Sequence, residues 1–316
     1  MALPAEYILT LQQIKGVGNK TIFKFAEQLS KTITSVDELF KFTSMSKDKK
    51  LNSLDKEDIL EANNIARRII DRSASKSIYA LSYYDDNFPE VLRHTINESG
   101  NPEPPLLIWY RGNISVAQLT GLAIIGTREP TEDGIKAGLH LASEFAKRDF
   151  NIVSGLAIGC DTCGHRGALD ALGKTTAILA NGLDTESIYP RENQALAEEI
   201  VEAGGLLLSE YSIGTGVNRY SLVARDRLQA GLAKATLVIQ TGVKGGTMHA
   251  ANTTLLAKKP LFVVKYKNEF TNQHEKSQGN AYLVTKGAQY ISGTDNLDEI
   301  SEKIKKVVKH KTSLFD

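Results

Sequence analysis

The sequence has little of several features that would assign it to a specialised class. Two cysteines in 316 residues cannot build a disulfide framework. No apolar run approaches the ~20 residues that a membrane helix needs, and no charged-then-apolar leader opens the chain. The 38 Lys and Arg residues balance 37 Asp and Glu residues, which excludes a uniformly basic nucleic-acid coat but not a local basic cavity. We therefore expect a cytoplasmic protein without a membrane partner.

The composition that remains is that of a globular protein, with 41% hydrophobic and 24% charged residues. The length fits about two domains of ~100–200 residues each. Residues 1–75 carry short helical patterns and predict a small all-helical domain. Its first two helices flank Gly16-Val17-Gly18, and the string resembles a helix-hairpin-helix (SAM-like) unit. Amides of that hairpin, with Lys20 beside them, can meet a phosphate; the alternative is a turn that only packs small helices.

The rest of the chain changes pattern twice. Residues 76–120 hold four of the eight prolines and predict a connector that packs on the core, with one short helix at most and one strand, 106–110. Residues 121–310 predict an α/β domain with a doubly wound, mostly parallel sheet, and 311–316 a tail. The last helix is expected at about 295–309, capped by Thr294 or Asp295. The apolar runs that predict the strands end at Ile125, Val153, Leu179, Leu208, Ile239 and Val264.

Loops at the carboxyl ends of such strands hold ligands. The first loop contains Gly126-Thr127-Arg128, and Thr131 can cap the next helix. It has no G-x-G-x-x-G, so we expect no dinucleotide cofactor. An arginine beside a glycine turn and a helix N-terminus suits a phosphate. The alternative is an ion pair between Arg128 and Glu129 or Glu132.

The second loop opens with Ser154-Gly155 and leads into Asp161 and His165. These two side chains are four residues apart, so a helix would place them on one face. Without a nucleophile nearby, orienting the loop is favoured over acid–base catalysis. The C-x-x-C pair of Cys160 and Cys163 suggests zinc or redox chemistry, but no second Cys/His cluster completes a zinc site. We expect no metal and two buried thiols.

Later loops add polar groups at the same sheet edge. Asn193 is predicted to cap a helix, and Arg225 and Arg227 to precede one that starts around them. Lys244 and Gly245-Gly246-Thr247 stand at another helix start. Together the loops predict an anionic, phosphate-bearing ligand, with scattered surface ion pairs as the alternative.

The motifs that carry these residues resemble the DNA-processing A (DprA/Smf) family over about 80–310. The matching strings include "IIGTREPTEDG", "VSGLAIGCDTCGHRGAL", "ARDRLQAGLAKATLVIQT" and "GGTMHAA". The resemblance implies a Rossmann-like core behind a small helical domain. It also implies a homodimer without enzymatic activity that binds single-stranded DNA and helps to load the recombinase RecA. Arg128, Arg225 and Arg227 would hold phosphate.

The sequence departs from the family pattern at several positions. Ile158 stands where Arg or Lys is usual, Asp226 replaces the middle Asn of an Arg-Asn-Arg motif, and Gln240 replaces an acidic residue. The C-terminal winged-helix domain of some members is not expected. The alternative function is a sensor or binder of a nucleotide-derived small molecule. Nucleotide phosphoribohydrolase activity is disfavoured, because Met248, His249 and Ala250 occupy the stretch where the required Glu is sought.

Overall fold

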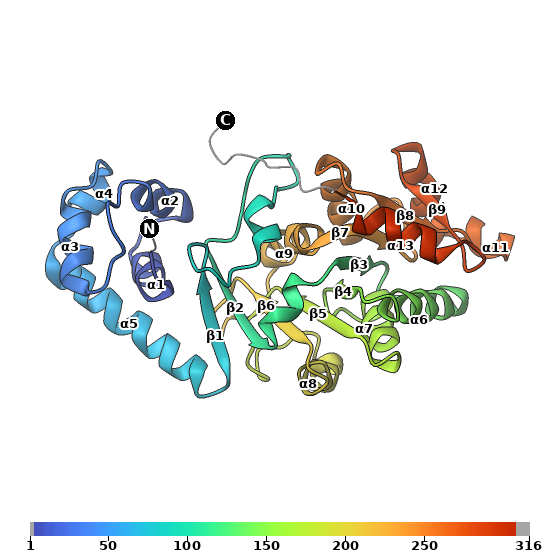
Figure 1. Ribbon diagram of the computed structural model, residues 1–316, viewed down its shortest axis with the longest axis horizontal. Helices are drawn as coiled ribbons and strands as arrows, with labels where there is room; N and C mark the ends of the chain where they lie inside the picture. Colours follow the sequence, from blue (N-terminus) through green and yellow to red (C-terminus); the bar gives the residue numbers. More distant parts are fainter. Residues whose placement is uncertain (1–2, 308–316) are drawn as a thin grey trace.

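The computed structural model describes residues 3–307. The tail predicted for 311–316 and the end of the helix predicted up to 309 lie outside the described residues. Figure 1 shows a row of helices at one end of the molecule, a sheet across its middle, and the helices that follow the seventh strand at the other end.

The first part of the described chain is helical, as predicted. Gly16 lies between the first two helices and adopts a φ of +87°, a conformation that glycine reaches without strain. Ser35 and Asp55 cap helices through their side chains. Fully buried side chains such as Ile8, Ile22 and Phe25 hold the helices together. The elements are α1 (Ala5–Gln13), α2 (Asn19–Ala26), α3 (Val36–Ser44), α4 (Lys49–Asn52) and α5 (Lys56–Ala74).

A nine-stranded sheet follows, in the order β1-β2-β6-β5-β4-β3-β7-β8-β9. All pairings from β6 to β9 are parallel, and β1 and β2 add an antiparallel edge. The chain runs outward from β3 to β6 on one side and then crosses to β7 on the other side of β3. The strands are β1 (Ile78–Ser82), β2 (Leu107–Gly112), β3 (Gly121–Ile125), β4 (Asn151–Ser154), β5 (Lys174–Leu179), β6 (Leu206–Ser209), β7 (Ala233–Val238), β8 (Leu261–Val264) and β9 (Gln289–Ile291).

Helices cover both faces of the sheet, which confirms the doubly wound α/β fold. Successive residues of β4 show the alternation: Ile152 joins the cluster under α6, and Val153 joins the cluster under α9. The helices of the core are α6 (Glu132–Ala146), α7 (Cys160–Asp170), α8 (Gln194–Glu202), α9 (Arg219–Leu232), α10 (Gly246–Leu256), α11 (Glu269–Gln273), α12 (Gln278–Thr285) and α13 (Leu297–Lys305).

Three expectations about these elements are wrong. The stretch 76–120 contributes two strands rather than one, because Ser77, at a φ of +56°, turns the chain from α5 directly into β1. It also forms two short 3₁₀ helices, η1 (Glu90–His94) and η2 (Ile114–Gln118). The cap of α13 is Asn296, since Asp295 instead accepts a hydrogen bond from the Ser292 amide.

Candidate functional site

A cavity of about 630 Å³ opens at the carboxyl ends of β3 and β7. This is the point where the strand order reverses, and open α/β sheets bind their ligands at such a point. Most of its lining comes from the loop after β3, from α9, and from the loop that leads from β7 into α10, and Ala157 and Asp161 after β4 complete it. Its cationic lining residues are Arg128, Arg219, Arg225 and Lys244.

The loop after β3 is held tightly at its base. The Thr127 amide donates to the Gln240 carbonyl at 2.7 Å, and the Cys160 amide donates to the Thr127 carbonyl at 3.1 Å. A Cβ at Gly126 would lie 2.5 Å from Cys160 Sγ, so only glycine fits there. Thr131 caps α6 as predicted, by accepting from the Gly134 amide.

Arg128 projects from this loop as an exposed side chain that lines the cavity. The alternative of an ion pair with Glu129 or Glu132 is wrong. Glu129 pairs with Lys276 at 3.2 Å, and Arg128 forms no ion pair with a carboxylate of residues 3–307. Its guanidinium is therefore available to an anion.

The second loop, after β4, owes its shape to Asp161. The Asp161 Oδ2 atom accepts from the amides of Gly155 at 3.1 Å and Ala157 at 3.4 Å. Burial raises the pKa of this carboxyl, and the Arg225 guanidinium acts against that effect. Ser154 is fully buried and donates to the Ile124 carbonyl at 2.5 Å. It therefore supports the loop and does not line the cavity.

Asn193 and His165, two more of the predicted site residues, lie on the side of this loop away from the cavity. Asn193 gives α8 no side-chain cap, contrary to the prediction. Its amide nitrogen instead donates to the Leu156 carbonyl at 2.8 Å and to Thr162 Oγ1 at 2.9 Å, which fixes the loop from the far side. His165 is fully buried with Nδ1 2.7 Å from Thr175 Oγ1, and burial lowers its pKa to about 3.

Arg225 crosses from α9 to the second loop and is only 7% exposed. A Cβ at Gly155 would lie 1.3 Å from Arg225 Nη1, so glycine is what lets the guanidinium reach this place. With its amide oxygen turned toward the loop, Gln229 accepts from Arg225 Nη1 at 2.7 Å and from the Gly155 amide at 2.8 Å. Asp161 Oδ2 lies 3.9 Å from the same Nη1 atom.

Arg227 does not line this cavity. Its guanidinium forms two bonds with Glu210, at 2.6 and 2.8 Å, and Nε donates to the Glu103 carbonyl. The helix start near Arg225 is also wrong, because α9 begins at Arg219. Residues two apart on a helix point in nearly opposite directions, so Arg225 and Arg227 cannot face the same cavity.

The opposite wall is the loop after β7. Lys244, Gly245, Gly246 and Thr247 line the cavity, and α10 begins at Gly246 as predicted. The sequence prediction missed Arg219, which lines the same cavity from the first turn of α9. The signal for it was Asn218 followed by Ser221, a capping box that marks the true start of the helix.

A smaller cavity of about 130 Å³ adjoins the first and shares Arg128 and Arg225 with it. Ile158, Tyr189 and Leu222 add apolar surface to its lining.

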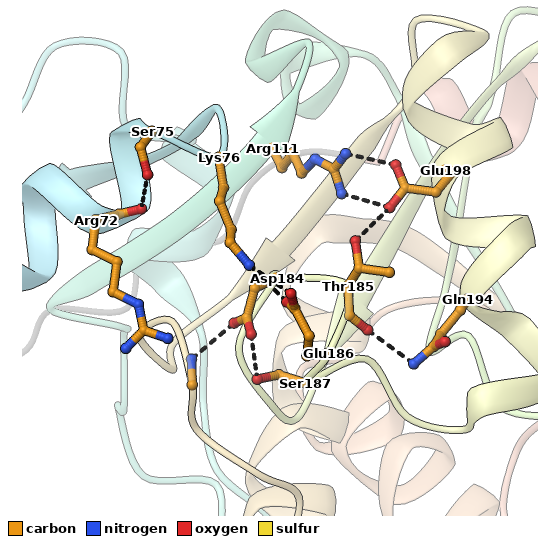
Figure 2. A network of polar contacts seen from close by, with 11 residues as sticks. Arg72, Ser75, Lys76, Arg111, Asp184, Thr185, Glu186, Ser187, Gln194 and Glu198 are labelled. Carbon is orange, nitrogen blue, oxygen red and sulfur yellow. Dashed lines mark hydrogen bonds and ion pairs between the residues drawn. The ribbon is translucent and has the colours of Figure 1, made fainter.

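The loop that carries Tyr189 follows β5 and is fixed by the polar network in Figure 2. Arg111 binds Glu198 through two nitrogens at 2.8 and 2.6 Å, and Thr185 Oγ1 donates to Glu198 at 3.0 Å. Lys76, after α5, pairs with Glu186 at 2.7 Å, so the helical region also contacts this loop.

The remaining predicted residues lie elsewhere. Gly16, Gly18 and Lys20 are exposed on the N-terminal helices and do not line either cavity. Cys160 and Cys163 are free and buried, and burial raises the pKa of both thiols. Residues 3–307 contain no group of three or more His, Cys, Asp or Glu side chains arranged to hold a metal ion. In the same residues, no helix combines the length and apolar character that crossing a membrane requires.

The fold and the cavity define a class: a Rossmann-like α/β protein with a cavity lined by cationic side chains at the switch point of its sheet. The family model for DNA recombination-mediator protein A matches residues 79–305. The chain belongs to this family. Protein Smf of Synechocystis is 32% identical over 243 residues, which are 73% of this chain. The chain spans 56% of the length of that relative.

Two solved structures show the same architecture. DNA processing protein A of Streptococcus pneumoniae has a TM-score of 0.71 at 26% identity, covering 95% of this chain and 99% of its own. Because so much of the chain is covered, the likeness extends over the N-terminal helices. The Helicobacter pylori protein, whose structure concerns a single-stranded DNA binding mode, has a TM-score of 0.59 at 30% identity, covering 72% and 96%.

Proposed function

We propose that the chain binds single-stranded DNA through the cationic cavity at the β3/β7 switch point, as a binding protein in the cytoplasm and not as an enzyme. One observation carries the proposal: Arg128, Arg219 and Lys244 line a single cavity and form no ion pair with carboxylates of residues 3–307. Single-stranded DNA supplies phosphates for such cations. The Helicobacter pylori relative, described as a single-stranded DNA binder, adds support.

Fluorescence anisotropy with a labelled thymidine oligomer tests the proposal. We expect Arg128→Ala to weaken binding roughly tenfold, because loss of a charge-assisted bond to phosphate costs about 1.5 kcal/mol. With 3–4 phosphates engaged, log affinity should fall with log salt at a slope of about −2 to −3, and the variant should flatten it by about 0.7. Arg68→Ala, which removes an exposed arginine from α5, is the matched control. Equal affinity of Arg128→Ala and Arg68→Ala would remove the proposed site.

Competition separates polymeric DNA from the alternative ligand, a nucleotide-derived small molecule. Unlabelled oligomer should displace the probe, and a mononucleotide at the same phosphate concentration should not, because it engages one phosphate instead of several. Complete displacement by the mononucleotide would favour the sensor function.

Three finer proposals complete the function. The first is that Gly16, Gly18 and Lys20 form a second phosphate contact on the N-terminal helices. The second and third, a homodimer and delivery of the strand to RecA, rest on the family alone. Sedimentation at several protein concentrations tests the dimer, and a strand-exchange assay with RecA tests delivery.

A further inference from the structure

Asp226 places a carboxyl group inside the cationic cavity. It follows Arg225 on α9 and is 9% exposed. Its side chain lines the cavity of about 630 Å³ and also a neighbouring one of about 440 Å³, which the segment around Glu98 and Glu103 borders. A carboxylate here repels any phosphate that the surrounding cations attract.

Asp226 forms an ion pair with Arg225 but is not its main anchor. Its Oδ1 atom lies 3.4 Å from Arg225 Nε, yet that Nε has no hydrogen-bond partner among residues 3–307. The other end of the guanidinium is held independently, by Gln229 at 2.7 Å and by the charge of Asp161. Removing the charge of Asp226 therefore leaves the main contacts of Arg225 in place.

We propose that Asp226 sets the affinity of this cavity for DNA: its carboxylate weakens phosphate binding, and its protonation in mildly acidic solution relieves the repulsion. The inference rests on the proposed function, because it concerns the same cavity and the same ligand.

The surroundings of Asp226 make protonation accessible near neutral pH. Burial raises its pKa to about 6, and the carboxylate of Asp161 acts in the same direction. Bound phosphate is an anion and raises this pKa further, so binding and proton uptake favour each other. The groups that oppose the shift are Arg225 on the same helix, Arg128 after β3 and His249 on α10. The other charges around the two cavities are Arg219, Lys244, Glu98, Glu103 and Arg227.

His249 on α10 also lines both cavities. Its Nδ1 atom lies 2.9 Å from Glu98 Oε2, so its polar contact is with a residue outside the cavity of about 630 Å³. A variant at His249 separates the contribution of this side chain from that of Asp226.

The test is the affinity for a thymidine oligomer without terminal phosphate, at pH 8.0 and pH 5.5 and constant ionic strength. Neither thymine nor an internal phosphodiester titrates in this range. We expect Asp226→Asn to bind roughly tenfold more tightly than the natural chain at pH 8.0, because the variant removes a negative charge from the cavity that the phosphate enters. The natural chain should tighten by a similar factor at pH 5.5, and Asp226→Asn by no more than about twofold.

Two further variants make the result specific. His249→Gln should keep most of the pH response if Asp226 causes it. Asp170→Asn, which neutralises an exposed carboxylate at the end of α7, should change neither affinity nor pH response. Unchanged or weaker binding by Asp226→Asn at pH 8.0, with the natural chain still binding, would overturn the inference and leave the proposed function intact. Absence of binding by the natural chain at both pH values would instead overturn the proposed function.

Discussion

The two faces of α9 use the same residue type in opposite ways. On the cavity face, Arg219 is exposed and forms no ion pair with a carboxylate of residues 3–307. Arg225, on the same face, is ion-paired with Asp161 and Asp226. On the other face, Arg227 is fully engaged by Glu210 and two carbonyl oxygens. We call the first the open face, because the charge of Arg219 remains available to a ligand there. We call the second the fixed face, because the charge of Arg227 is bound to Glu210 and holds the helix in place.

The fixed face explains how the open face keeps its shape. At the end of α9, Lys259 Nζ donates to the carbonyls of Ala230, Gly231 and Ala233 at 2.7, 3.0 and 2.7 Å. Together with the Arg227 pair, these bonds hold the helix against the sheet. Cations presented by a rigid element lose little conformational entropy when they bind, so a held helix is a good platform for anion recognition.

Breaking the fixed face should produce the largest effect. Arg227→Met leaves Glu210 with a largely buried, unpaired charge, and we expect a loss of about 3–5 kcal/mol in the free energy of unfolding. Chemical denaturation measures it. The double variant Arg227→Met with Glu210→Gln should recover part of that loss, because no charge remains unpaired. DNA affinity should stay within about twofold wherever the variant is folded. Equal instability of the single and double variants would show that packing, not charge, is responsible.

The contrast on α9 also shows where prediction from sequence ends. The apolar runs located the carboxyl ends of β3 and β7, because a short buried strand is a local signal. The glycine turns that follow these strands located Arg128 and Lys244 at the same sheet edge. Which way Arg227 points depends on the phase of α9. Placing the helix start six residues late assigned both arginines to the cavity and missed Arg219.

The edge strand β9 was missed by the sequence prediction for a different reason. β9 has only three residues, Gln289–Ile291, of which two are exposed, so no apolar run marks it. The roles of Gly155 and Asn193 depend on contacts with Arg225 and Leu156, 70 and 37 positions away in sequence. Such contacts follow from tertiary packing and leave no periodic pattern.

Acid should change the free energy of unfolding in opposite directions through two of the buried titratable groups near the cavity, His165 and Asp226, and this effect should be intermediate in size. The pKa of His165 is about 3 in the folded chain, below its ordinary 6.5, so the unfolded chain binds more protons and stability falls as pH drops from 7 to 5, by about 2 kcal/mol. The pKa of Asp226 is about 6, above its ordinary 3.8, so it contributes the opposite sign, about 1 kcal/mol. Asp226→Asn should therefore lose about 1 kcal/mol more than the natural chain over this interval. Urea denaturation at both pH values measures the difference, and identical losses would contradict the assignment.

Removing one cation from the open face should have the smallest effect on the fold and a modest one on binding. Arg219 lies exposed in the first turn of α9. Its guanidinium carbon lies 5.9 Å from the centre of the Tyr220 ring, and within residues 3–307 its charge has no other partner. Arg219→Ala should change the free energy of unfolding by no more than about 0.5 kcal/mol. It should weaken DNA binding about three- to fivefold and reduce the salt slope by about 0.7. Anisotropy titrations at several salt concentrations measure both. A flatter salt dependence with an unchanged free energy of unfolding would establish that the two faces of α9 are energetically separate. A loss of stability comparable to that of Arg227→Met would show that they are coupled.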